Sequence, residues 1–152
     1  MGNISNQEAV ARKQRWAFLE GVAFNQNCRM IVTAHHKNDQ VENFLLQVMR
    51  GLPIESTIMS KENEKNGFVR YKPFLDVEKN ILINSAKRNN IPWIEDVTNL
   101  DTHHDRNYIR NVLIPSMMER RNVMKTIPMT IESIKKQNTY PSDECDTSLA
   151  FK

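Results

Sequence analysis

The sequence predicts an α/β fold in which a parallel sheet is flanked by helices. Two kinds of segment support this prediction: short β-branched runs of strand length, and longer segments with apolar residues every three or four positions. These segments alternate along the chain, as they do in parallel sheets. Strands are expected near residues 29–34, 68–71 and 91–94. With 152 residues, of which 39% are hydrophobic, the chain is long enough to bury a core.

The first expected element is a helix that runs to about Phe24. The segment Ser5–Glu8 has the spacing of a capping box, and a discontinuous apolar face follows it. The other face carries Arg12 and Arg15, which are three residues apart and are therefore neighbours on the helix surface. Such a pair suits a phosphate group. A solvated basic surface is, however, the commoner state of such a pair.

The central stretch joins an expected strand, Met30–Ala34, to an expected helix through a short polar turn. Apolar residues recur at helical spacing from Val41 onward, so the period changes between the two segments. We expect Asn38 to be the N-cap, Asp39 to place a negative charge in the first turn, and Gly51 to end the helix. In open α/β sheets, ligands bind at such turns, beyond the carboxyl ends of strands.

Four residues of this turn and helix are candidates for chemistry. His35 and His36 are neighbours on extended chain and should point to opposite sides, so only one of them can easily face a site. Asp39 and Glu42 are three apart on a helix and should share a face, where they could meet a cation, a ribose or a proton in transit. Alternatively, Asp39 only favours the helix dipole, Glu42 is solvated, and one histidine belongs to the core.

The middle of the chain predicts a loop, a strand, a helix and another strand. Residues 52–67 are polar and broken by proline and glycine, which indicates a loop. Residues 68–71 form a short strand candidate, and Asp76 is the expected N-cap of a helix that ends near Asn89. Residues 91–94 are the third strand candidate.

The polar segment 95–110 is expected to be a functional loop over the edge of the sheet, followed by a helix that Asp105, Arg106 and Asn107 begin. Arg106 and Arg110 are four apart and could bind phosphate through bidentate hydrogen bonds. The alternative is that these arginines pair with nearby carboxylates and only order the loop; the candidates are Asp101, Asp105 and Glu95.

The C-terminal end should be a helical extension over residues 119–137 and a disordered tail over 138–152. Cys28 and Cys145 form neither a metal motif nor a disulfide framework, which favours a reducing cytoplasm. No apolar run is long enough to span a membrane. The net charge of +3 permits contact with RNA without arguing for it. His103 and His104 lack the further ligands that a zinc site needs.

Four blocks, in the same order, resemble the tRNA(Ile)-lysidine synthase family of the N-type ATP pyrophosphatase (PP-loop) superfamily. The central block resembles T-A-H-H-x-D-D-Q-x-E followed by L-L and R-G, and the others resemble N-x-E-x-x-A-R-x-x-R-Y, R-P-L-L and P-W-x-E-D followed by R-N-x-x-R. In this chain they are Thr33–Gly51, Asn6–Trp16, Tyr71–Leu75 and Ile91–Arg110. The resemblance covers residues 6–118, as a partial PP-loop domain.

The resemblance implies an adenine nucleotide alpha hydrolase-like fold, here incomplete, and a cytoplasmic ligase. Such an enzyme uses ATP and Mg²⁺ to join free L-lysine to the cytidine at the first anticodon position of tRNA(Ile). It does not act on DNA. The implied catalytic residues are His35, Asp39, Glu42 and Arg106, with Asp39 as a possible Mg²⁺ ligand. The implied substrate-binding and tRNA-binding residues are Arg12, Arg15, Arg50, Asn107 and Arg110.

The chain departs from the family pattern at two places. Asn38-Asp39 stands where the family has two adjacent aspartates. The family also has a phosphate loop with the sequence S-G-G-x-D-S, which does not occur in this sequence. The sequence contains only 4 glycines, too few and too scattered for such a loop. Two further hypotheses are therefore kept. One is a non-catalytic or split fragment that retains tRNA-binding surface and needs a homo-oligomer or a complementing chain with the phosphate loop. The other is an unrelated metal-dependent hydrolase that uses His35, Asp39 and Glu42.

Overall fold

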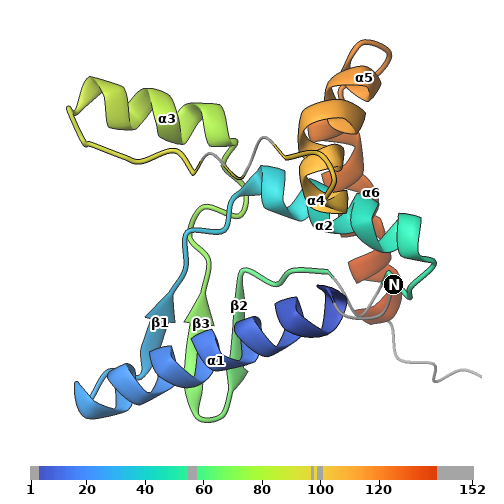
Figure 1. The fold of residues 1–152 in the computed structure, drawn as a ribbon. Coiled ribbons are helices and arrows are strands. Elements are labelled where there is room, and N and C mark those ends of the chain that lie inside the picture. The colour runs from blue at the N-terminus through green and yellow to red at the C-terminus, as the bar shows by residue number, and fades with distance from the viewer. Residues whose placement is uncertain (1–3, 55–57, 97, 99–100, 140–152) are drawn as a thin grey trace, which may run out of the picture. The chain divides into compact units, whose positions relative to one another are not determined.

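The structure is a computed structural model that describes residues 4–54, 58–96, 98 and 101–139 (Figure 1). The chain divides into two compact units. The first unit comprises residues 1–39 and 59–93, and the second comprises residues 40–58 and 94–152. Helix α2, Lys37–Arg50, begins in the first unit and continues in the second.

The first unit is built on a mixed sheet of three strands: β1 Met30–Val32, β2 Glu62–Lys65 and β3 Phe68–Tyr71. The order in the sheet is β1-β3-β2, with β1 parallel to β3 and β2 antiparallel to it. The parallel pair places Met30 opposite Val69 and Val32 opposite Tyr71. The fold class is therefore confirmed, and two of the three expected strands are present where the sequence predicts them.

The loop expected over residues 52–67 is wrong in its last part, because β2 occupies Glu62–Lys65 and forms a hairpin with β3. Asn66 and Gly67 join the strands with φ of 53° and 79°. Positive φ at both central positions is the geometry of the tight hairpin turns that asparagine followed by glycine favours. All four residues of β2 are exposed, so no apolar alternation marks the strand in the sequence.

The strand expected at residues 91–94 is absent, and residues 91–96 have no regular secondary structure. Ile94 is 97% exposed, and Ile91 and Trp93 are also exposed. A short β-branched run becomes a strand only when a neighbouring strand provides backbone partners. None of the described strands pairs with this segment.

Helix α1, Ile4–Asn25, lies along the sheet of the first unit (Figure 1). The guanidinium of Arg70 in β3 stacks on the Trp16 ring at 3.8 Å from its centroid. The same guanidinium pairs with Glu20, whose carboxylate also accepts a hydrogen bond from Asn66. These contacts fix α1 to β3, while Ala23 and Ile31 are buried. Helix α3, Lys79–Arg88, completes the unit.

The second unit is helical and contains the larger core. Besides residues 40–50 of α2 it has α4 Asp105–Tyr108, the π-helical turn η3 Ile109–Leu113, α5 Ile114–Met118 and α6 Val123–Thr139. Its core cluster consists of Val41, Leu45, Leu46, Ile109, Ile114, Val123, Met124, Ile127 and Ile131. Helix α6 extends beyond the expected boundary at residue 138, and the rest of the expected tail lies outside the described residues.

Candidate functional site

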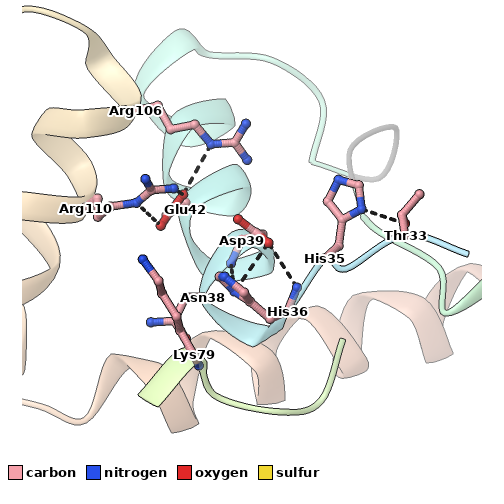
Figure 2. Close-up of polar contacts among 9 residues, drawn as sticks. All are labelled: Thr33, His35, His36, Asn38, Asp39, Glu42, Lys79, Arg106 and Arg110. Atoms are coloured by element: carbon pink, nitrogen blue, oxygen red, sulfur yellow. Dashed lines mark hydrogen bonds and ion pairs between the residues drawn. The ribbon is translucent and has the colours of Figure 1, made fainter. Parts of the chain in front are cut away.

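The turn after β1 is closed by a reciprocal pair of hydrogen bonds between His36 and Asp39 (Figure 2). The His36 backbone N–H donates to Asp39 Oδ2 at 3.0 Å, and the Asp39 backbone N–H donates to His36 Nδ1 at 3.3 Å. This is the arrangement of a capping box, with histidine and aspartate in the places usually held by serine or threonine and glutamate. Because α2 begins at Lys37, the N-cap is His36, and the expectation that Asn38 caps this helix is wrong.

Asn38 caps a different helix. Its Oδ1 accepts a hydrogen bond of 2.9 Å from the backbone N–H of Lys79, the first residue of α3. Lys37 adds a backbone hydrogen bond to Val77 and an ion pair of 3.2 Å to Glu78. The start of α2 is thereby joined to the start of α3 within the first unit.

The expected N-cap at Asp76 is also wrong. Helix α3 begins at Lys79, and its N-cap residue is Glu78, which makes no capping hydrogen bond with its side chain. Asp76 pairs instead with Lys61 at 3.0 Å. The backbone N–H of Lys79, three residues after Asp76, thus donates to Asn38, which lies 41 residues away in the chain.

His35 and His36 make different contacts. His35 Nδ1 lies 2.8 Å from the Thr33 hydroxyl, whereas His36 faces Asp39 (Figure 2). Both histidines are half-buried. Thr33 fixes the orientation of the His35 ring at the carboxyl end of β1, which is the position where the sequence predicts chemistry.

In the second unit, Glu42 is the centre of a charged cluster on α2. Its side chain is only 2% exposed, and both carboxylate oxygens accept hydrogen bonds from guanidinium groups (Figure 2). Arg110 donates from Nε to Oε1 and from Nη2 to Oε2, each at 2.8 Å, and Arg106 donates from Nε to Oε2 at 3.2 Å. Arg106 and Arg110 therefore come together as expected, one helical turn apart on α4 and η3.

This cluster corrects the alternative that nearby carboxylates hold the two arginines. Their partner is Glu42, more than 60 residues earlier in the chain. Asp105 pairs with Arg50 at 3.3 Å. A buried carboxylate that neutralises two guanidinium groups keeps them in fixed positions. The side chain of Arg106 is 37% exposed, so part of it remains accessible to a ligand.

Asn107 orders the loop before α4. Its Nδ2 donates to the backbone carbonyls of Thr98 and Asp101, at 2.9 and 2.8 Å. In the same loop, hydrogen bonds from the Thr98 hydroxyl and backbone N–H lower the pKa of Asp96. The two hydrogen bonds of Asn107 support a structural role for this residue. The family resemblance implied that it binds substrate or tRNA.

Arg12 and Arg15 both lie exposed on α1 in the first unit. Neither residue forms an ion pair within the described part of the chain. His35 and Asp39 belong to the first unit, like Arg12 and Arg15. The other predicted site residues belong to the second unit: Glu42, Arg50, Arg106, Asn107 and Arg110.

The described residues contain no group of three or more histidine, cysteine, aspartate or glutamate side chains that could hold a metal ion. Mg²⁺ is usually held by one or two carboxylates with water and substrate phosphates. Asp39 offers a single carboxylate, of which Oδ2 already accepts the His36 N–H. Asp39 Oδ1 accepts none of these hydrogen bonds, so one carboxylate oxygen could still meet a Mg²⁺ ion that water and substrate phosphates also hold, and Asp39 as a Mg²⁺ ligand stays a prediction.

Sequence reasoning missed the capping role of His36 and the link from Asn38 to Lys79. The first had a signal, because His36 and Asp39 have the i, i+3 spacing of a capping box. The second had none, because the two residues are far apart in the chain.

Comparison with known proteins decides the family. The model of the PP-loop domain family matches residues 2–117. This chain belongs to the PP-loop domain family. A tRNA(Ile)-lysidine synthase of Coxiella burnetii is 38% identical over 114 residues, which cover 74% of this chain and 25% of that protein. Similar proteins of the same name occur in Haemophilus ducreyi, at 35% identity over 74% of this chain and 26% of the relative, and Pseudothermotoga lettingae, at 33% over 72% and 24%.

The PP-loop chain spans about a quarter of the length of these curated relatives. Its membership confirms the family resemblance and contradicts the alternative of an unrelated hydrolase. None of the helices in the described part of the chain is both long and apolar enough to cross a membrane.

Proposed function

We propose that this PP-loop chain takes part in an ATP-dependent modification of tRNA in the cytoplasm. More specifically, we propose the ligation of free L-lysine to the cytidine at the first anticodon position of tRNA(Ile). The observation that carries the proposal is the set of relatives, which are named tRNA(Ile)-lysidine synthase and are 33–38% identical over about three quarters of the chain. The polar turn that follows β1 supports it, because ligands of open α/β sheets bind at such turns.

The proposed reaction has two steps. The C2 oxygen of cytidine attacks the α-phosphorus of ATP, and pyrophosphate leaves. A lysine amine then attacks C2, AMP leaves, and the nitrogen loses a proton. The protein must bring these reactants together, stabilise the negative charge on the phosphates and accept that proton.

Residue chemistry suggests a division of these tasks. We assign His35 to proton transfer, because an imidazole can accept and donate a proton and its ring is oriented by Thr33. We assign Arg106 to phosphate contact, because its side chain is partly exposed and charged. Glu42 then acts as a positioning residue for Arg106 and Arg110. Asp39 fixes the turn and brings a negative charge to the reacting groups.

A second candidate function is tRNA binding without catalysis by this chain alone. The observation that favours it is the lack of a glycine-rich S-G-G-x-D-S loop among the 152 residues. PP-loop binding of phosphate depends on the converging backbone N–H groups of such a loop, which arginine side chains cannot reproduce. We therefore expect weak ATP binding by the 152-residue chain, and activity only with a complementing chain or in an oligomer that supplies the loop.

A nucleoside assay tests both candidates. tRNA(Ile) is incubated with ATP, Mg²⁺ and lysine, and lysidine is measured by mass spectrometry with the 152-residue chain alone and with an added polypeptide that carries the phosphate loop. We expect lysidine only in the second reaction. Lysidine from the chain alone would contradict the need for the loop, and its absence from both reactions, with tRNA still bound, would favour the binding function.

A further inference from the structure

One face of α1 contacts β3 through side chains that are one helical turn apart. Arg12, Trp16 and Glu20 are spaced four residues apart and therefore lie on the same side of the helix. Glu20 pairs with Arg70 of β3, and Trp16 lies under the same guanidinium at 3.8 Å. Arg12 is one helical turn closer to the N-terminus than Trp16, on the same side of α1. It therefore lies past Arg70, on the side away from Glu20.

Lys72 comes directly after β3 and extends the row of side chains that faces α1. It is two residues after Arg70, and side chains two apart on extended chain point to the same side. Its ammonium donates to the carbonyl oxygen of Ser60 at 3.0 Å and to Asn63 Oδ1 at 3.5 Å. Both acceptors are uncharged, and an ammonium group has three donors, so these contacts leave capacity for another acceptor.

The two ends of this α1–β3 seam differ in charge. At one end the Glu20 carboxylate neutralises Arg70. At the other end, neither Arg12 nor Lys72 forms an ion pair with a carboxylate among the residues that the structure describes. Partial burial, with the positive charges of Arg70 and Arg12 nearby, lowers the pKa of Lys72. An anion placed there would relieve this repulsion.

We propose that Lys72 and Arg12 form a phosphate-binding site on the first unit. The chemistry it recognises is a phosphate group, from the tRNA backbone or from ATP. A guanidinium and a half-buried ammonium provide several donors that converge from a helix and from the end of a strand. The choice of tRNA or ATP as the source of the phosphate rests on the proposed function. The proposal adds Lys72 to the residues expected to bind a ligand.

Binding measurements on the 152-residue chain test the site. The affinities for a tRNA(Ile) transcript and for ATP are measured separately, at several salt concentrations, for the wild type, Lys72→Gln, Arg12→Gln and the control Lys61→Gln. Lys61 is a suitable control because it lies nearby in the chain but is paired with Asp76. Each variant is checked by circular dichroism, and if Lys72→Gln unfolds, Arg12→Gln on the exposed helix surface provides the same test.

We expect Lys72→Gln and Arg12→Gln each to weaken tRNA binding by about three- to tenfold. The slope of log affinity against log salt should fall by about 0.7 to 0.9, the value for one lost phosphate contact. A loss confined to ATP binding would support the site with the nucleotide as its source. Unchanged affinity and slope for both ligands, or an equal loss in Lys61→Gln, would overturn the proposal. Because the readout is binding, failure of the lysidine assay leaves this test intact.

Discussion

Arg110 donates two parallel hydrogen bonds of 2.8 Å to the carboxylate of Glu42, which is almost completely buried. This pair joins α2 to η3 inside the second unit, and Arg106 adds a third hydrogen bond. Charged groups that are buried together depend on each other, because removal of one leaves the others without compensation in a medium of low polarity.

Glu42→Gln should therefore destabilise the second unit by about 3 kcal/mol. Glutamine keeps the size of the side chain but removes the charge that balances two guanidinium groups. The measurement is urea unfolding followed by circular dichroism, together with amide hydrogen exchange of residues 105–118. Glu132→Gln is the matched control, since the carboxylate of Glu132 is 61% exposed and pairs with Lys135 of the same helix, and its cost should stay under about 1 kcal/mol. Equal costs for the two variants would contradict this role of Glu42.

Asp39 offers a way to separate stability from catalysis. Asp39→Asn retains an oxygen that can accept the His36 N–H, so the turn should remain folded. In an active reconstituted complex, turnover should nevertheless fall by about 100-fold if the negative charge acts on the reacting groups. Asp39→Ala should additionally destabilise the chain by about 1 kcal/mol through loss of the cap. An Asp39→Asn complex with an unchanged rate would remove the charge from the mechanism.

The contact between Asn38 and Lys79 predicts opposite effects of two substitutions. Asn38→Ala leaves the first N–H of α3 without its acceptor and should cost about 1 kcal/mol. Asn38→Asp restores the residue of the family signature and places a negative charge at a helix N-terminus, where it should stabilise the first unit by about 0.5 kcal/mol. Thermal unfolding at neutral pH and low salt measures both. Destabilisation by Asn38→Asp as large as that by Asn38→Ala would contradict the capping role.

Glu20 predicts a pH dependence of stability. Hydrogen bonds from Asn66 and Arg70 lower its pKa below the ordinary value of 4.5. A carboxyl group whose pKa is lower in the folded state contributes stability that is fully present above 4.5 and is lost as the pH falls through the folded value. Urea unfolding between pH 2 and 6, followed by Trp16 fluorescence in a Trp93→Phe background, should show this loss.

The matched variants for this pH dependence are Glu20→Gln and Glu62→Gln. Glu20→Gln should be less stable at neutral pH and should show a smaller decline toward acid. Glu62→Gln, on the exposed strand β2, should keep the wild-type decline. A Glu20→Gln variant whose stability falls with acid as steeply as that of the wild type would assign the effect to other carboxyl groups.

Local patterns in the sequence predicted the helices and strands that bury an apolar face. They failed for segments whose secondary structure does not depend on such burial. Val41 and Leu45 have helical spacing and are buried in α2. Strand β2 has no buried residue, so its only signal was the Asn66-Gly67 dipeptide. Residues 91–94 have the composition of a strand but no described partner, because strand formation depends on neighbours that composition does not specify.

The candidate site shows the same division between local and distant information. Helical spacing correctly predicted that Arg106 and Arg110 are neighbours. It could not identify Glu42 as their common partner, since that contact depends on the fold of the second unit. The turn after β1 was located from the change of period. The choice between Asn38 and His36 as its cap depended on a shift of two residues in the start of the helix, and the ends of a helix are the least certain part of such a prediction.

The two edges of the sheet have very different characters. Strand β2 ends the sheet with Glu62, Asn63, Glu64 and Lys65, and charged side chains at an edge oppose pairing with another chain. Strand β1 ends it with Met30, Ile31 and Val32, whose backbone groups on the outer side have no described strand beside them. Among the described strands, β1 is therefore the edge that is better suited to accept a further strand. A strand added at β1 would lie directly beside the turn that holds His35 and Asp39.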